Sequence, residues 1–535
     1  MPSSKPFQIY TPLIYASLLA LGMFMGFKLY ESVRGRTNVM MRHGSTIDEV
    51  LNYIEAQYVD TVDEAHLEDQ AIIEMVGGLD PHSSYIPAEE LKEVAENLQG
   101  NFDGIGVEFA IINDTITVVT PISGGPSEAL GVRAGDKIIE INDTTVAGTK
   151  ITNEQVVGKL RGVKGTIVEV AIQRRGTKEL IHFDIMRDKI PIISVDAGYM
   201  LDDKTGYIKI NRFSATTSDE FMQKLLALNQ QGMSQLILDL RQNPGGYLNA
   251  AVDIADEFIS GKNLIVYTEG RSYRRKDYKA RRTGTFEEGK LVVLVDEGSA
   301  SASEIIAGAV QDWDRGTIIG RRSFGKGLVQ DQYDLNNGGA LRLTVARYHT
   351  PSGRCIQKPY EEGNGEDYGD EINKRYKHGE LQNADSIKLD DADTTTYRTL
   401  VEGREVFGGG GIMPDIFVPL DTSRFETFVI RARSVIPEFA YKYYGEHGAE
   451  FKGYPDVQTF RRNYQVSDAL FAHFKAELKT ELGFVDEKLL NRERQYLATF
   501  IRAYIARQLY GSDGFYPIIQ DTDDMLLKAI AEMKK

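Results

Sequence analysis

The chain has 535 residues, of which 42% are hydrophobic and 26% charged, and it contains 51 glycines. This length exceeds what one hydrophobic core organises, so we expect several domains, and the composition excludes a disordered or fibrous chain. The net charge of −16 argues against nucleic-acid binding. With Cys355 as the single cysteine and no HExxH-like histidine spacing, an intramolecular disulfide is excluded and no metal or other cofactor is expected.

An uncharged apolar run, Leu13 to Phe27, lies near the N-terminus between Lys5 and Lys28. We interpret residues 12–30 as a signal anchor or transmembrane segment, although the run is shorter than the ~20 residues of a spanning helix. No small-x-small cleavage site follows it, which favours an uncleaved anchor over a removed signal peptide. More Lys and Arg follow the run than precede it, and by the positive-inside rule alone this favours a cytoplasmic body.

A small helical region is predicted over residues 40–98. Apolar residues recur at helical spacing from Ile47 to Ile54, and a second apolar set spans Ile72 to Val76. The pattern stops at Gly77-Gly78, just before the sequence LDPHSSY.

Residues 99–188 show short β-type runs separated by turns. The runs are VEFAII, TITVVT, KIIEIN and IVEVAI, with one helix-like segment at 153–160. The stretch Gly104-Ile105-Gly106-Val107 alone indicates a tight turn, but together with the turn GVRAGD at 131–136 and the helix it resembles the carboxylate-binding loop of a PDZ domain. Free N–H groups in such a loop are suited to bind a terminal carboxylate while the peptide adds to the sheet as a strand.

Residues 189–420 alternate strands with helices, which is typical of an α/β layered domain. The strand 235–240 precedes the sequence RQNPGG and an amphipathic helix. The strand 291–295 precedes GSASASE and a second helix, and the strand 316–320 leads to SFGKG.

Two segments lack this alternation. Residues 360–405 are polar and acidic, and we interpret them as a surface insertion or flexible loop. Residues 421–535 are aromatic and charged with helical periodicity, which predicts a helical C-terminal domain that docks, dimerises or covers the core.

Three side chains in the α/β region are candidates for chemistry. The sequence GSASASE at 298–304 places a serine (Ser299, Ser301 or Ser303) at a strand-to-helix turn, where a nucleophile is exposed near unpaired N–H groups, although a serine here is also typical of a helix N-cap. No His and Asp partners stand at a recognisable spacing, so a conventional triad is not indicated. Lys326 follows 25 residues later between two glycines, and Gln330 follows four residues beyond it. A lysine acts as a base near neutral pH only where burial depresses its pKa.

Together these segments resemble the carboxyl-terminal processing peptidases, also called tail-specific proteases. The matching motifs, in chain order around the PDZ-like unit, are LDPHSSY (79–85), LDLRQNPGG (238–246), GSASASE (298–304), RRSFGKGLVQ (321–330), YHTPSGRCIQ (348–357) and GGGIMPD (409–415).

The resemblance implies a crotonase-like or Clp-protease-like α/β core with an inserted PDZ domain, an N-terminal helical region and a helical C-terminal domain. In that family the nucleophile is the serine 25 positions before the lysine of FGKG. This carries the role to Ser301 rather than to Ser299 or Ser303.

The same resemblance implies that Lys326 is the general base and that Gln330 orients it. It also implies an oxyanion hole of backbone N–H groups from Gly245 or Gly246 and from Ala302, which strand-to-helix turns make geometrically plausible.

The expected function is that of a serine endopeptidase that recognises the free apolar C-termini of unfolded or flexible proteins and cleaves proteins of the cell envelope. Because the family works mostly outside the cytoplasm, we expect an inner-membrane-anchored protein with its body in the periplasm. The C-terminal helices are candidates for homo-oligomer contacts, and no nucleic-acid partner is expected.

Two other functions fit parts of the pattern. One is a catalytically silent PDZ adaptor with the α/β core as scaffold, which the intact Ser301, Lys326 and Gln330 disfavour. The other is a crotonase-type enzyme acting on acyl-CoA, which predicts an anion site for the CoA phosphates and no PDZ unit.

Overall fold

The computed structural model describes residues 15–26, 28, 46–361, 363, 365–387, 395–424 and 426–535. The chain divides into two compact units on either side of the bond between Met75 and Val76. Of the predicted signal anchor, residues 15–26 form a helix, and the rest of 12–30 lies outside the described residues except for Lys28. No helix within the described ranges has the length and apolarity needed to cross a membrane.

The predicted N-terminal helices are confirmed as α2 (Thr46–Gln57) and α3 (Glu64–Gly77). In α2 the apolar residues Ile47, Val50 and Ile54 lie one helical turn apart, which gives the helix an apolar stripe. As the sequence predicts, α3 ends at the double glycine.

The PDZ-like region is built on one twisted antiparallel sheet with the order β3-β4-β5-β7-β8, and β6 pairs with β5. Its strands are β3 (Val107–Ile112), β4 (Thr115–Pro121), β5 (Lys137–Ile141), β6 (Thr144–Thr145), β7 (Ile167–Gln173) and β8 (Ile181–Met186). Helices α5 (Pro126–Ala129) and α6 (Asn153–Leu160) complete it, and the Thr152 side chain caps the N-terminus of α6. Strand β3 lies at the edge of this sheet.

A two-stranded ladder joins the two ends of this region. Strand β2 (Asn101–Gly104) pairs antiparallel with β9 (Asp188–Pro191). The chain therefore enters and leaves the PDZ-like sheet at the same place, as expected for a domain inserted into another fold.

The α/β core contains a six-stranded sheet in the order β10-β11-β12-β15-β16-β21, parallel except for the β10–β11 pair. Its strands are β10 (Val195–Met200), β11 (Thr205–Ile210), β12 (Gln235–Asp239), β15 (Lys290–Val295), β16 (Thr317–Gly320) and β21 (Ile416–Phe417). Because successive side chains of a strand point to opposite faces, Leu236 and Leu238 pack into one apolar cluster while Ile237 packs into another.

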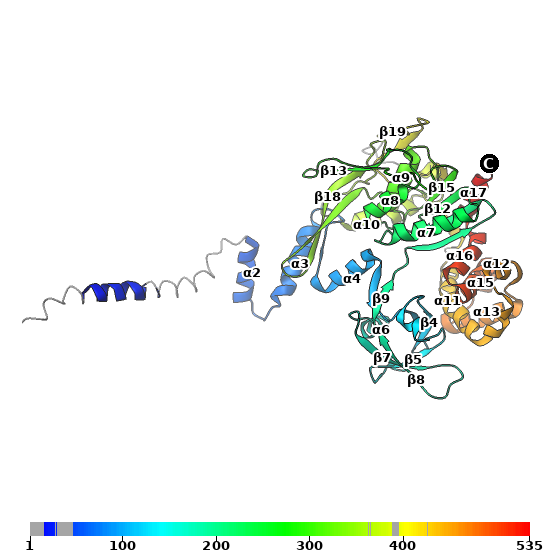
Figure 1. Cartoon of the computed structure of the whole chain (residues 1–535), viewed down its shortest axis with the longest axis horizontal. Helices are drawn as coiled ribbons and strands as arrows, with labels where there is room; N and C mark the ends of the chain where they lie inside the picture. The colour runs from blue at the N-terminus through cyan, green and yellow to red at the C-terminus, as the bar shows by residue number, and fades with distance from the viewer. Residues whose placement is uncertain are drawn as a thin grey trace, which may run out of the picture. The chain divides into compact units, whose positions relative to one another are not determined.

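Helices cover both faces of this sheet. The first cluster contains residues of α7 (Thr217–Gln230), α8 (Leu248–Ala255) and α9 (Ala302–Asp312), which lie together in Figure 1. The second contains Met525, Leu526 and Ala529 of α17 (Asp524–Met533). Helix α17, the last helix of the predicted C-terminal domain, therefore packs on the core, which is one of the roles expected for residues 421–535.

A second, antiparallel sheet has the order β1-β18-β13-β14, and β17 also pairs with β18. These strands are β1 (Ser84–Ile86), β13 (Leu264–Glu269), β14 (Lys276–Lys279), β17 (Leu328–Asp334) and β18 (Ala340–His349). Strand β1 directly follows the LDPHS sequence and pairs with β18, which also pairs with β17, the strand that follows Lys326.

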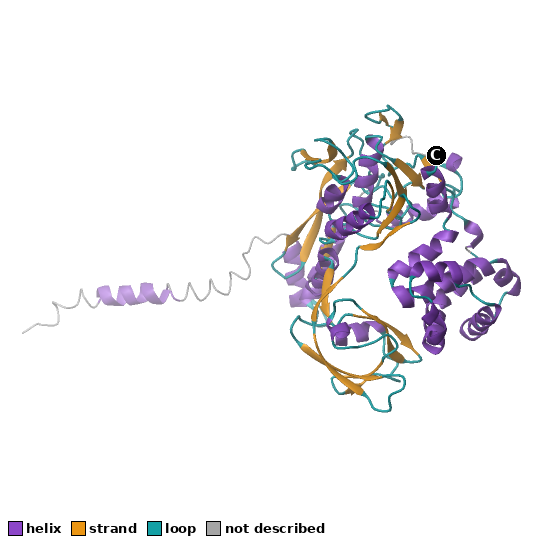
Figure 2. Cartoon of the chain, turned by 45° about the vertical axis from the view of Figure 1, so that its right-hand side comes forward, coloured by secondary structure: helices purple, strands orange, loops and turns teal. Residues whose placement is uncertain are grey.

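The rest of the C-terminal region is helical, as predicted, and Figure 2 shows it as helices joined by loops. Its helices are α11 (Thr427–His447), α12 (Val457–Asn463), α13 (Asp468–Leu482), α14 (Glu487–Arg492), α15 (Arg494–Tyr510) and α16 (Ser512–Ile519). Their buried core is rich in phenylalanine, including Phe460 and Phe474, which are fully buried.

Of the two alternatives predicted for 360–405, the flexible loop is wrong for much of the segment, whereas most of its described residues are exposed or half-buried, as in a surface insertion. It contains α10 (Gly365–Lys377) and a hairpin of β19 (Thr396–Arg398) with β20 (Glu405–Phe407), and its residues 388–394 lie outside the described ranges. Arg375 of α10 is buried beside Glu380, which also pairs with the buried Arg322. The buried charges of Arg375 and Glu380 are neutralised by each other and by Arg322.

Candidate active site

Two loops of the α/β core carry the candidate catalytic residues. Ser301 ends the loop after β15 and immediately precedes α9, and Lys326 lies in the loop between β16 and β17. The backbone of Ser301 has φ +53°, a region that side-chain-bearing residues rarely occupy. Such a turn presents the side chain above the first N–H groups of the helix.

The three serines of the SASAS sequence differ in accessibility. Ser299 and Ser303 are fully buried, and their hydroxyls donate to the carbonyl oxygens of Leu240 (2.9 Å) and Asn243 (3.0 Å). Ser301 is partly exposed, and its hydroxyl donates no hydrogen bond to any of the described residues. Ser301 is thus the serine whose hydroxyl is available to react.

The buried carboxylate of Glu304 joins the two loops. Its Oε2 accepts from the backbone N–H of Ser301 (2.8 Å) and of Lys326 (2.9 Å). Its Oε1 accepts from the N–H of Gly325 (2.8 Å) and from the hydroxyl of Ser323. Burial raises the pKa of Glu304, and these hydrogen bonds act in the opposite direction. One side chain therefore fixes the backbone of Ser301 relative to that of Lys326.

A second link between the loops comes from Tyr348 of β18, whose side chain is buried. Its hydroxyl oxygen lies 2.6 Å from the carbonyl oxygen of Lys326 and 3.0 Å from that of Ser301. The loop sequences gave no signal for this contact, because Tyr348 lies in another motif of the chain.

The amine of Lys326 is held by an amide side chain, as the sequence suggested. Its Nζ donates to Oε1 of Gln330 (3.2 Å), and Nε2 of Gln330 donates to the carbonyl oxygen of His82. Burial lowers the pKa of Lys326, and the positive charge of Arg342 lowers it further. A lysine in these surroundings loses its proton more readily than one in water.

The NPGG turn lies against the Ser301 loop. A Cβ atom at Gly245 would lie 2.8 Å from the Cβ of Ser301 and 2.9 Å from the nitrogen of Ala302. The N–H of Gly245 donates to Oδ1 of Asn243 (2.9 Å). Those of Gly246 and Ala302 have no acceptor among the described residues. The glycines therefore permit a close approach of the NPGG turn to the Ser301 loop. The N–H groups of Gly246 and Ala302 stay unpaired within the described chain.

The PDZ loop is held through its carbonyl groups. The carbonyl oxygen of Ile105 accepts from the hydroxyl and N–H of Ser127, and that of Gly106 accepts from the N–H of Ile122. Gly106 has φ +73°, while Gly104 lies in β2 and Val107 begins the edge strand β3. The N–H groups of Ile105 and Gly106 donate to no acceptor in the described part of the chain. Unpaired donors thus precede a free strand edge, but this loop belongs to a different domain from Ser301.

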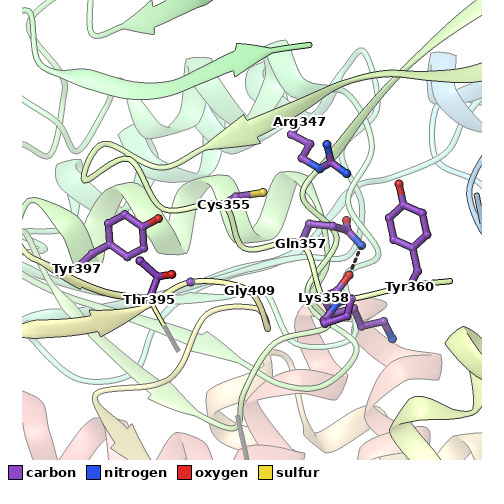
Figure 3. Close-up of a pocket in the computed structure, with 10 residues that line it drawn as sticks. Arg347, Cys355, Gln357, Lys358, Tyr360, Thr395, Tyr397 and Gly409 are labelled. Carbon is purple, nitrogen blue, oxygen red and sulfur yellow. Dashed lines mark hydrogen bonds between the residues drawn. The ribbon is translucent and has the colours of Figure 1, made fainter. Parts of the chain in front are cut away.

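A pocket of about 510 Å³ lies beside the Lys326 loop (Figure 3). Its wall includes Gln357, whose Oε1 accepts from the N–H of Gly327, and Lys358, whose N–H donates to the carbonyl oxygen of Gly325. Arg347 and Tyr360 lie on the same side of the pocket as Gln357 and Lys358, and Tyr397 lies on the opposite side. The pocket is lined by aromatic, polar and cationic side chains. No cluster of three or more potential metal ligands occurs among the residues that the structure describes.

Comparisons with known proteins agree with this architecture. The sequence profile of peptidase family S41 matches residues 204–364, that of the PDZ domain matches 117–174, and that of a family of unknown function, DUF8443, matches 428–511. The α/β core, the PDZ domain and the candidate site thus define a serine peptidase of family S41.

Sequence relatives define the branch of this family. The chain is 38% identical to the carboxy-terminal-processing protease of Bartonella bacilliformis over 316 residues, which are 58% of this chain and 71% of the relative. It is 35% identical to the carboxy-terminal processing protease CtpB of Bacillus subtilis over 316 residues, 65% of that relative. The solved photosystem II D1 C-terminal processing protease has 30% identity and a TM-score of 0.33, with coverage of 59% of this chain and 84% of that one. This chain belongs to the carboxy-terminal processing proteases.

Proposed function

We propose that this protein is an endopeptidase in which Ser301 is the nucleophile and Lys326 the general base. The observation that carries the proposal is the shared carboxylate of Glu304, which fixes the backbone of both residues from one buried point. The lowered pKa of Lys326 supports the same roles, because a base must be neutral to accept a proton.

In the proposed reaction, the neutral amine of Lys326 takes the proton of the Ser301 hydroxyl as Oγ attacks the carbonyl carbon of the scissile bond. The resulting ammonium then gives its proton to the leaving amine, and the carbonyl carbon stays bonded to Oγ as an acyl ester. Water attacks this ester with Lys326 again as base, which releases the acid and restores the serine. Gln330 keeps the amine oriented through both steps.

The negative charge on the substrate carbonyl oxygen requires N–H donors. We assign this role to Gly246 and Ala302, whose N–H groups have no acceptor in the described chain. Of the two glycines that the sequence offered, Gly246 is favoured because the N–H of Gly245 already donates to Asn243.

The PDZ loop is proposed to bind the free C-terminal carboxylate of the substrate. The support is the pair of N–H groups at Ile105 and Gly106, next to the free edge of β3. A peptide bound there adds to the sheet as a strand, and its remote binding energy increases specificity.

Amidation of the substrate tail tests this role. Replacing the terminal carboxylate of an unfolded substrate by an amide is expected to lower kcat/KM roughly 10-fold or more, since hydrogen bonds to a charged group contribute about 1.5–3 kcal/mol. Both substrates are compared at equal concentration. A third substrate, whose tail is extended by one acidic residue and keeps its α-carboxylate, shows how a change of charge alone affects kcat/KM. Equal kcat/KM for the free and amidated tails would contradict recognition by this loop.

We further propose that the substrates are proteins of the cell envelope and that the body faces the periplasm. Two observations support this proposal. One is the apolar run from Leu13 to Phe27, and the other is that the chain belongs to the carboxy-terminal processing proteases, which are expected to work mostly outside the cytoplasm. Protease added to intact spheroplasts is expected to digest the body of the protein and to spare a cytoplasmic marker. Protection of the body until the spheroplasts are lysed would place it in the cytoplasm.

A further inference from the structure

Helix α10, which lies beyond the part of the chain that the S41 profile matches, packs against the loop that carries Lys326. Its residues Tyr368 and Arg375 are 7% and 3% exposed. The guanidinium of Arg375 donates to the carbonyl oxygens of Ser323 (3.1 Å) and Arg322 (2.8 Å). The helix is thus attached to the chain just before Lys326.

The ring of Tyr368 holds the same loop from one side. It lies edge-on to Phe324, with 5.8 Å between ring centroids. The ammonium of Lys358 lies 4.0 Å from the centroid of each of these two rings, and the N–H of Lys358 donates to the carbonyl oxygen of Gly325 (2.9 Å). Buried cation–π contacts of this kind stabilise the position of Lys358 between the rings of Tyr368 and Phe324.

The hydroxyl of Tyr368 reaches the other side of the loop. It accepts from Nε2 of Gln357 (3.1 Å), whose Oε1 in turn accepts from the N–H of Gly327. It also lies 2.9 Å from Nε2 of His82. Burial, followed by the charge of Lys326, lowers the pKa of His82 to about 4, so the imidazole is neutral at neutral pH. In the tautomer protonated at Nδ1, Nε2 accepts the hydroxyl hydrogen of Tyr368.

His82 continues this chain of contacts to the proposed base. Its carbonyl oxygen accepts from Nε2 of Gln330, and Oε1 of Gln330 accepts from the amine of Lys326. We propose that Tyr368 is a positioning residue, whose hydroxyl fixes His82 so that His82 holds Gln330 and Gln330 aims the amine of Lys326. The proposal rests on the function proposed above for Lys326.

Removing this one hydroxyl leaves the fold and the ring contacts in place but releases the imidazole of His82. The residue is then held through its N–H, which donates to Oδ1 of Asp80 (2.8 Å), and the carbonyl oxygen that Gln330 bonds is fixed less firmly. The Tyr368→Phe variant is expected to lower kcat roughly 5- to 20-fold with KM within about twofold, because a misaligned base affects the chemical step more than binding. The acid limb of its pH–rate profile moves to lower pH, since the ammonium form of Lys326 loses an aligned acceptor. A defect of folding alone lowers the amount of active enzyme without moving this limb.

The experiment measures kcat, KM and the pH profile of the full-length protein on an unfolded protein substrate with a free tail. The matched control is Tyr376→Phe, since Tyr376 lies on the same helix and is 42% exposed. Because Tyr368 acts through Gln330, the double variant with Gln330→Ala is expected to match Gln330→Ala alone. Unchanged kcat and pH limb in Tyr368→Phe, or additive effects in the double variant, would overturn the proposal. Ser301→Ala, measured in parallel, separates this result from a failure of the proposed function, because activity in that variant contradicts the function itself.

Discussion

The Ser301→Ala variant is expected to lose about 10⁴- to 10⁶-fold in kcat on an unfolded substrate, which is the range seen when the nucleophile of a serine peptidase is removed. In the proposed mechanism this hydroxyl forms the acyl ester, and neither neighbouring serine can replace it because both are buried and hydrogen-bonded. The measurement is the rate at which the purified full-length protein generates new N-termini in the substrate.

The control for this variant is Ser272→Ala, which removes the hydroxyl of an exposed serine from the turn between β13 and β14. It is expected to retain full activity. Ser303→Ala is not a suitable control, since it breaks a buried hydrogen bond to Asn243 beside the active loop. Cleavage by Ser301→Ala at the wild-type rate would exclude Ser301 as the nucleophile.

The Lys326→Ala variant is expected to lose about 10²- to 10⁴-fold in kcat/KM, the usual contribution of a general base. For the wild type, kcat/KM rises with pH as Lys326 becomes neutral and levels off above its pKa. Because burial and Arg342 lower this pKa, the plateau begins below the ordinary lysine value of ~10.4. In Lys326→Ala, kcat/KM is expected to be low at every pH, without the rise that the neutralisation of Lys326 causes in the wild type.

Lys326→Arg sharpens the same test, because arginine keeps the positive charge but stays protonated at every accessible pH. It is expected to be as inactive as Lys326→Ala, whereas Lys262→Ala, at an exposed lysine of the same core, keeps both rate and pH profile. An active Lys326→Arg variant would mean that position 326 supplies charge and not a base.

Local sequence patterns predicted much of the fold. The β-type run VEFAII forms β3 and the segment 153–160 forms α6, because local composition and periodicity reflect short-range preferences. The ladder of β2 with β9 joins residues almost 90 positions apart, and periodicity carries no information about such a contact. For the same reason, periodicity alone could not choose packing of α17 on the core from the several roles expected for the C-terminal helices.

The burial of two charged residues in the polar segment around α10 was not predicted, because a buried charge and a surface charge look alike in a sequence. Arg375 and Glu380 are both buried, and their charges are balanced by each other and by Arg322 more than 50 positions earlier. Hydropathy cannot distinguish this buried network from a solvated face.

At the candidate site, the motifs indicated Ser301, Lys326 and Gln330, and the structure brings Gln330 to the amine of Lys326. Sequence alone could not choose between Gly245 and Gly246, because the choice depends on where the Asn243 side chain points. It also missed Glu304 and His82, although both lie inside the motifs that carried the family resemblance. Their roles arise from a hydrogen-bond network between segments that are distant in sequence, which spacing does not reveal.

Covalent labelling separates activation of Ser301 by Lys326 from other roles of the lysine. The full-length protein is treated with a serine-reactive fluorophosphonate, and the labelled peptide is located by mass spectrometry. We expect one fast-labelled residue, Ser301, with no fast label in Ser301→Ala and labelling in Lys326→Ala slowed by about 10²-fold or more. Labelling of Ser301 at the same rate in wild type and Lys326→Ala, or fast labelling of a different serine, would contradict this expectation.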